Sequence, residues 1–90
     1  MNERLWEIYE QLCLVEMVNL PEFVTRVKSG EFGAFETEAV VAFLREIEAN
    51  MLQNIQAKTA EHHAYAEMAN QVSEDTEKMF EELIEDVRRG

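Results

Sequence analysis

No glycine or proline occurs between Ala34 and Arg89. Glycine and proline are the residues that most often end helices and begin turns, so their absence over more than half of the chain predicts long helices. The whole sequence contains three glycines and one proline, too few for the many turns of a β-rich fold. We therefore expect an all-α protein in which residues 1–90 form a single helical domain.

The spacing of apolar residues predicts the order of these helices. Over residues 2–19, apolar residues recur every three or four positions, which places them along one face of a helix. Pro21 is expected to end this helix and to open a short second one over residues 21–29, with Gly30 as its C-cap. A long third helix should begin at Glu36. Its apolar face is formed by Val40, Phe43, Leu44, Ile47, Met51 and Ile55.

The long helical region is expected to divide. Its apolar face weakens after Ile55, and Ser73 with the acidic residues after it is typical of a helix N-terminus. We therefore expect a break or kink near residues 70–73, with one uninterrupted helix as the alternative.

A helix over residues 36–70 would be about 52 Å long, whereas a compact chain of this size has a radius of gyration of about 12 Å. Other copies would have to cover the excess, so we expect a helical bundle completed by homo-oligomerisation.

The charge is strongly negative and unevenly distributed. The net charge is −11, and residues 61–90 carry nine acidic against three basic side chains. Such a surface repels nucleic acid and anionic membranes, so we expect no direct nucleic-acid partner and no membrane partner. The longest apolar run is interrupted by Glu16, and Cys13 is the only cysteine. Without a recognisable signal peptide, these features predict a cytoplasmic protein.

Residues 23–35, FVTRVKSGEFGAF, combine two cations, two glycines and three aromatic rings. Backbone amides at a glycine turn, together with cations, can hold a small anion, and aromatic rings can stack on a base. The candidate ligand-binding residues are Tyr9, Arg26, Lys28, Ser29, Gly30 and Phe32. The same stretch also fits a plain corner between two helices, because a cation followed by a glycine is typical of a helix C-terminus. The corner is the preferred interpretation.

Two other stretches are candidates for binding a protein partner. The terminal segment SEDTEKMFEELIEDVRRG predicts an amphipathic acidic helix that fits a basic surface. Its partner-binding candidates are Glu74, Asp75, Glu77, Glu81, Glu82, Glu85 and Asp86. The first helix is apolar nearly all round between residues 12 and 20, which indicates burial on more than one side. A solvated outer face is the plainer interpretation of the acidic segment.

Catalytic and metal-binding patterns are weak. Cys13 lies in the most apolar part of the first helix, where burial would keep its thiol inert. Glu16 is expected on a polar strip of the same helix. His62 and His63 are adjacent, and neighbouring helical residues diverge by about 100°, so one helix cannot easily direct both at one ion. We expect no enzyme, no cofactor and no metal site, although a symmetric dimer could bring two histidine pairs together.

These observations favour a non-enzymatic, acidic helical interaction protein that acts by self-association and protein binding, as an adaptor, chaperone-like subunit or inhibitor. Its expected partners are itself and a basic protein. The alternative is an oligomer that sequesters a small anionic or nucleotide-like ligand in an intersubunit pocket near residues 26–35. A third interpretation is an acidic mimic of nucleic acid, which would compete with DNA for a basic protein in a salt-dependent way.

Overall fold

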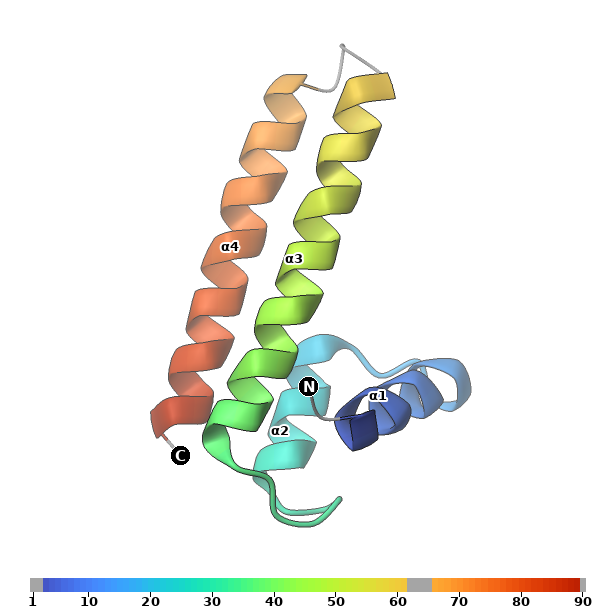
Figure 1. The fold of residues 1–90 in the computed structure, drawn as a ribbon, viewed down its shortest axis with the longest axis vertical. Helices are drawn as coiled ribbons and strands as arrows, with labels where there is room; N and C mark the ends of the chain where they lie inside the picture. Colours follow the sequence, from blue (N-terminus) through green and yellow to red (C-terminus); the bar gives the residue numbers. More distant parts are fainter. Residues whose placement is uncertain (1–2, 62–65, 90) are drawn as a thin grey trace.

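The computed structural model describes residues 3–61 and 66–89, and every regular element in these ranges is a helix. The helices are α1 (Glu3–Val15), α2 (Leu20–Lys28), α3 (Thr37–Glu61) and α4 (Ala66–Arg89). The two long helices α3 and α4 form an antiparallel hairpin, and α1 and α2 lie beside its lower part (Figure 1). The molecule measures 45 × 28 × 21 Å, so it is clearly elongated. The expected all-α class is confirmed.

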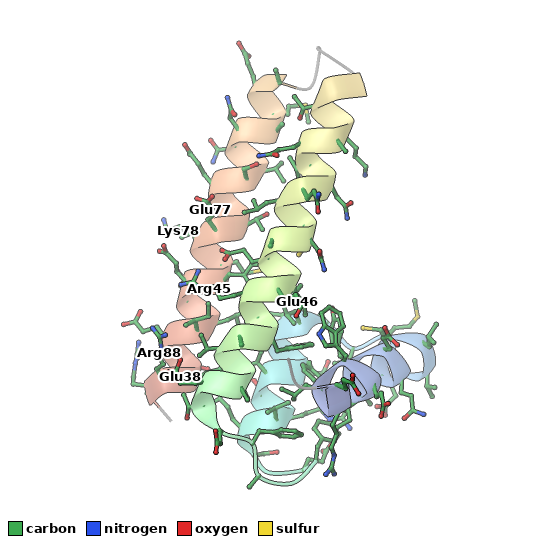
Figure 2. All side chains as sticks on the ribbon, in the orientation of Figure 1. Glu38, Arg45, Glu46, Glu77, Lys78 and Arg88 are labelled. Carbon is green, nitrogen blue, oxygen red and sulfur yellow. The ribbon has the colours of Figure 1, made fainter. Side chains whose placement is uncertain are left out.

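The division of the long helical region differs from the expected one. The residues between α3 and α4 are 62–65, outside the described ranges. Because α4 is one helix through residues 70–73, the expected break is absent there, and a kink at that place stays a prediction. The Glu38 Oε1 and Arg88 Nε atoms lie 3.6 Å apart, which shows that the start of α3 pairs with the end of α4 (Figure 2). In this register the apolar first half of α3 lies opposite the apolar second half of α4. A reversal near residue 71 would separate these two stretches, so burial overrides the local cap signal at Ser73.

The first helix is shorter than the expected 2–19, because two caps form within that range. The Val18 N–H donates to the Leu12 carbonyl at 3.4 Å across Met17, whose φ is +53°. A residue in the left-handed conformation just past the last turn is a common way for a helix to end. Asn19 then caps α2, because its side-chain oxygen accepts from the Glu22 N–H at 2.9 Å. The expected short helix with Pro21 in its first turn is confirmed, and Ser29 is its C-cap.

The core lies where all four helices meet. Phe43 of α3 is 1% exposed, and its ring centroid is 5.0 Å from Trp6, 5.6 Å from Tyr9 and 5.6 Å from Phe23. Aromatic pairs at such edge-on or tilted angles are favourable beyond the area that they bury. The buried apolar residues are Leu5, Val18, Leu20, Phe23, Val24, Val27, Val40, Val41, Phe43, Leu44, Ile47, Phe80, Ile84 and Val87. The short helices thus complete the core of the hairpin on one flank.

The other end of the hairpin has no such core. We call residues 49–61 of α3 and 66–73 of α4 the distal arm, and the rest of the two helices the proximal half. Among the described side chains of the distal arm, none is buried. Met51, Met68 and Val72 remain 39%, 62% and 46% exposed. In Figure 1 the distal arm stands alone, with neither α1 nor α2 beside it.

Candidate functional site

The stretch 26–35 forms a corner held by its own hydrogen bonds. Gly30 and Gly33 have φ angles of +82° and +98°, a region in which other residues are strained. The Gly30 N–H donates to the Val27 carbonyl at 3.2 Å, and the Gly33 N–H donates to the Gly30 carbonyl at 3.0 Å. The Ser29 hydroxyl donates to the Arg26 carbonyl at 2.7 Å. The glycines therefore have a structural role in the turn between α2 and α3.

Both cations of the corner already have carboxylate partners. Arg26 donates from Nε to Glu31 Oε2 at 2.7 Å and from Nη1 to Glu16 Oε2 at 3.0 Å. These two carboxylates, Glu31 first, raise the pKa of Arg26 above its usual value. Lys28 Nζ lies 3.1 Å from Asp86 Oδ1 of α4. The charges of the corner thus nearly cancel, and Glu16 contributes to this balance through its ion pair with Arg26.

The structure does not bring the six predicted ligand-binding residues together. Lys28, Ser29 and Gly30 line a small pocket of about 320 Å³ between the corner and the ends of α3 and α4. Phe32 lines a different pocket and stacks on Phe23 with 6.1 Å between ring centroids. Arg26 and Tyr9 line neither of these two pockets. Ligand binding by the full set stays a prediction.

Tyr9 belongs to the core rather than to the corner. Its ring lies 5.1 Å from Phe23, centroid to centroid, and its hydroxyl group forms a hydrogen bond with Cys13. Burial, followed by the interaction with Cys13, raises the pKa of Tyr9 above its usual 10.0. The Cys13 thiol in turn donates to the Val18 carbonyl at 3.6 Å. Cys13 therefore stabilises the end of α1, and it is half-buried, less enclosed than we expected.

The predicted acidic surface lies along the outside of α4. Its seven carboxylates are all exposed, while Phe80, Ile84 and Val87 of the same helix face the core. Three of the seven have partners: Asp75 accepts from Gln71, Glu85 pairs with Arg89 and Asp86 pairs with Lys28. The other four form no ion pair or hydrogen bond with any residue in the described ranges. This surface carries charge but almost no apolar area, and its partner-binding role stays a prediction.

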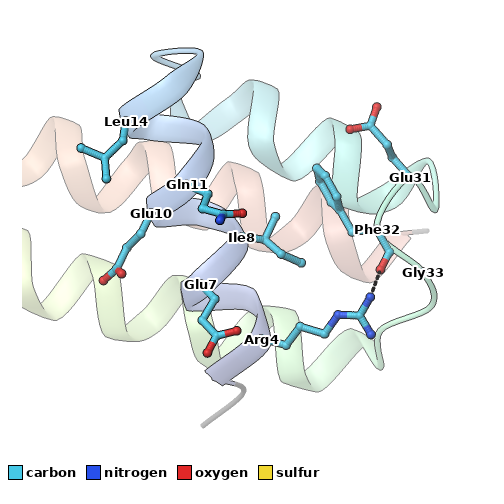
Figure 3. A pocket seen from close by; sticks show the side chains of 9 residues that line it. All are labelled: Arg4, Glu7, Ile8, Glu10, Gln11, Leu14, Glu31, Phe32 and Gly33. Carbon is cyan, nitrogen blue, oxygen red and sulfur yellow. Dashed lines mark hydrogen bonds between the residues drawn. The ribbon is translucent and has the colours of Figure 1, made fainter.

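A groove lies between α1 and the turn at residues 31–33 (Figure 3). It encloses about 820 Å³ and is open to solvent along one side. Arg4 spans one end, where its Nη2 donates to the Phe32 carbonyl at 3.0 Å and its guanidinium lies 5.8 Å from the Phe35 ring centroid. The apolar lining residues are Ile8, Leu14 and Phe32, and the acidic ones are Glu7, Glu10 and Glu31. The groove therefore combines apolar side chains with an excess of carboxylates.

An exposed apolar edge continues from this groove to the end of α1. Leu14, Val15 and Met17 are 83%, 80% and 86% exposed, and we call these three residues the α1 edge. The sequence contained a signal for it, because residues 12–20 are apolar nearly all round. Such a run indicates burial, however, and could not reveal that the left-handed turn at Met17 would leave all three side chains in solvent.

Within the described ranges, no group of three or more histidine, cysteine, aspartate or glutamate side chains is arranged to hold a metal ion. His62 and His63 lie outside the described residues. No described helix has both the length and the apolarity that a membrane span requires.

The comparisons with known proteins give no family for the chain. No family model, no curated protein and no solved structure matches it. Its function is therefore argued from its own residues.

Proposed function

We propose that the chain is a non-enzymatic helical interaction protein, which acts by self-association and by binding a basic protein as an adaptor, chaperone-like subunit or inhibitor. The observation that carries this proposal is the α1 edge. Three large apolar side chains are exposed to solvent within four residues at the end of one short helix, and Leu14 among them also lines the groove with its three carboxylates. Large apolar side chains that are exposed close together are typical of interaction sites.

Met17 strengthens the argument. Its φ of +53° is the left-handed conformation that glycine usually adopts just after a helix. The methionine side chain is 86% exposed, so it contributes little to the packing of the monomer. A backbone conformation that disfavours the residue present is a reason to look for a role of its side chain. Methionine is flexible and polarisable, which suits it to a binding surface.

The groove beside the α1 edge suggests the chemistry of the partner. Glu7, Glu10 and Glu31 line it together with apolar side chains, and Arg4 is the only cation among its lining residues. A segment with apolar residues on one face and lysine or arginine on its flanks would match both features. The α4 surface matches only the charge, because the apolar residues beside its carboxylates, Phe80, Ile84 and Val87, are used in the core. The α1 edge is therefore our preferred partner site.

Sequestration of an anionic ligand has less support. Arg26 and Lys28 already contact three carboxylates, so an added anion would have to displace these partners in a protein of net charge −11. The small pocket beside Lys28 remains the place where such a ligand would be sought.

A defined peptide tests the proposal. A synthetic amphipathic helix of leucine and lysine is titrated into the protein by calorimetry, alongside the same peptide with glutamate in place of lysine. We expect the lysine peptide to bind, and Leu14→Glu to weaken binding by at least about tenfold, since it introduces a carboxylate into an apolar contact. Gln53→Glu adds the same charge to an exposed position of α3 and is the matched control.

Equal binding of both peptides, or equal loss in the two variants, would contradict the proposed site. Deletion of residues 73–90 is not a suitable test of the α4 surface, because it removes Phe80, Ile84 and Val87 from the core. Replacing Glu74, Glu77 and Glu81 with glutamine tests that surface with the fold intact. If this triple variant lost the peptide and Leu14→Glu did not, the partner site would move to α4.

A further inference from the structure

We infer that the uncovered flank of the distal arm binds the same flank of a second copy of this chain, in an antiparallel arrangement that forms a four-helix bundle. The inference rests on the proposed self-association and names the surface, the partner and the geometry. One flank of the α3–α4 hairpin is covered by α1 and α2 in its proximal half and is exposed in its distal half (Figure 1).

On α4 this flank is marked by residues spaced four and seven apart. Met68, Val72, Met79 and Asp86 fall on one side of the helix because each such step nearly completes whole turns. At the proximal end, Asp86 is held by Lys28 of α2 at 3.1 Å, and Met79 packs against the core. At the distal end, Val72 is 46% exposed and Met68 is 62% exposed.

On α3 the same flank shows the same gradient. Phe43, Ile47 and Met51 follow one another at four-residue steps and are 1%, 7% and 39% exposed. Phe43 is covered by Trp6 of α1 and Phe23 of α2. Exposure rises where these short helices end, and the apolar pattern of the flank extends as far as Met51. The distal arm thus lacks the second layer of helices that a helical hairpin needs to bury its flank.

The charge of the distal arm indicates that the second layer comes from another copy. Lys58 contributes +1 and Glu61 and Glu67 contribute −1 each, so the arm carries −1 and the rest of the chain carries −10 of the total of −11. Two copies that met through the strongly acidic proximal half would bring like charges together. The distal arm is the part of the hairpin where identical chains can approach without that cost.

Charge also selects the orientation. In a parallel pair the two strongly acidic proximal halves would lie side by side, whereas in an antiparallel pair they lie at opposite ends. Each flank is two helices wide, so two of them give the four helices of an ordinary bundle with two-fold symmetry. Two molecules 45 Å long that overlap over about 20 Å of helix would make a particle about 70 Å long.

The contact is small. The flank is roughly 20 Å long and 20 Å wide, below the standard area of about 800 Å² per partner. We therefore expect a dimer that dissociates on dilution. Sedimentation over about a hundredfold range of concentration, with small-angle X-ray scattering at the upper end, measures both the equilibrium and the particle length.

Val72→Glu is the decisive variant. It would place an unpaired carboxylate on each side of the contact, and we expect the dimer dissociation constant to rise at least about tenfold. Asn70→Glu is the matched control: it makes the same chemical change in the same helix, but two positions away and therefore rotated by about 200° to the opposite flank. Both positions are exposed in the monomer, so both variants should keep their helical circular dichroism. Met68→Glu, also exposed, is an independent second test.

The outcomes separate the inference from the proposed function. Loss of the dimer in Val72→Glu and Met68→Glu, but not in Asn70→Glu or Leu14→Glu, supports the inference. A dimer that is lost only in Leu14→Glu overturns it and leaves self-association through the α1 edge. A wild-type protein that stays monomeric at every concentration overturns both the inference and the self-associating part of the proposed function. A dimer only about as long as the monomer overturns the antiparallel arrangement.

Discussion

The proximal half and the distal arm are built from the same two helices, yet they are stabilised differently. In the proximal half, Phe43 and Phe80 are 1% and 0% exposed, and α1 and α2 complete the core. In the distal arm no described side chain is buried, and Met68 is 62% exposed. The two regions also differ in charge, since the arm carries only −1 of −11. The exposed apolar side chains, the low charge and the missing cover of the distal arm are the reasons for the proposed assembly.

The largest expected effect lies in the proximal half. Phe43→Ala removes a ring that contacts Trp6, Tyr9 and Phe23, and we expect it to lower the free energy of unfolding by about 3–5 kcal/mol. Chemical denaturation followed by circular dichroism measures this loss. A loss below about 1 kcal/mol would mean that the core of the short helices contributes little, and the contrast between the two regions would fail.

The corresponding change in the distal arm should cost much less. Ile55→Ala truncates a half-buried side chain, and in dilute monomer we expect a loss of about 1 kcal/mol. At concentrations where the dimer forms, the loss should increase, because the arm is then partly covered. Hydrogen exchange adds a second readout: distal amides should exchange by local opening well before proximal ones. Equal protection along α3 would contradict the contrast.

Met17→Gly should stabilise the protein slightly. Glycine removes the strain of the left-handed conformation, and the side chain that is lost is 86% exposed. After the entropy that glycine adds to the unfolded chain, we expect a gain of about 0.5–1 kcal/mol, seen as a higher thermal midpoint. The same variant should bind the lysine peptide more weakly. Higher stability with unchanged binding would show that Met17 has no role in the α1 edge.

Lys28→Ala tests the ion pair that joins α2 to α4. The pair with Asp86 is partly exposed, so we expect a loss of at most about 0.5 kcal/mol. Added salt should abolish the difference between the variant and the wild type. A loss of several kcal/mol would indicate that the ion pair, and not the aromatic core, holds α2 against the hairpin.

The smallest effect is confined to alkaline pH. The pKa of Tyr9 is raised in the folded state, so the folded protein keeps a proton that the unfolded chain releases. The resulting stability is complete below pH 10 and is lost as the pH rises through the folded-state pKa. In a Tyr65→Phe background, phenolate absorbance reports Tyr9 alone, and adding Cys13→Ala should lower its pKa toward 10.0. A normal pKa in the folded protein would show that Tyr9 is more solvated than its ring contacts indicate.

Much of the fold follows from local sequence patterns, and the remainder depends on long-range packing. The scarcity of glycine and proline predicted the helices, and Pro21 and Gly30 predicted the ends of the short one. The position of the α3–α4 division was not predicted, because Ser73 gives a valid local cap signal that the pairing of two distant apolar stretches overrides. The α1 edge could not be predicted either, because a run of apolar residues indicates burial. Only the turn at Met17 shows which of these residues stay in solvent.

Trp6 has one more consequence. It is the only tryptophan, its ring packs on Phe43, and its buried Nε1 atom has no hydrogen-bond partner among the described residues. Its fluorescence emission should therefore be blue-shifted in the native protein and should respond to melting of the proximal half alone. Fraying of the distal arm would be silent in this signal but visible in helical circular dichroism. If the fluorescence and circular-dichroism signals diverge on heating, they would show directly that the proximal half and the distal arm melt separately.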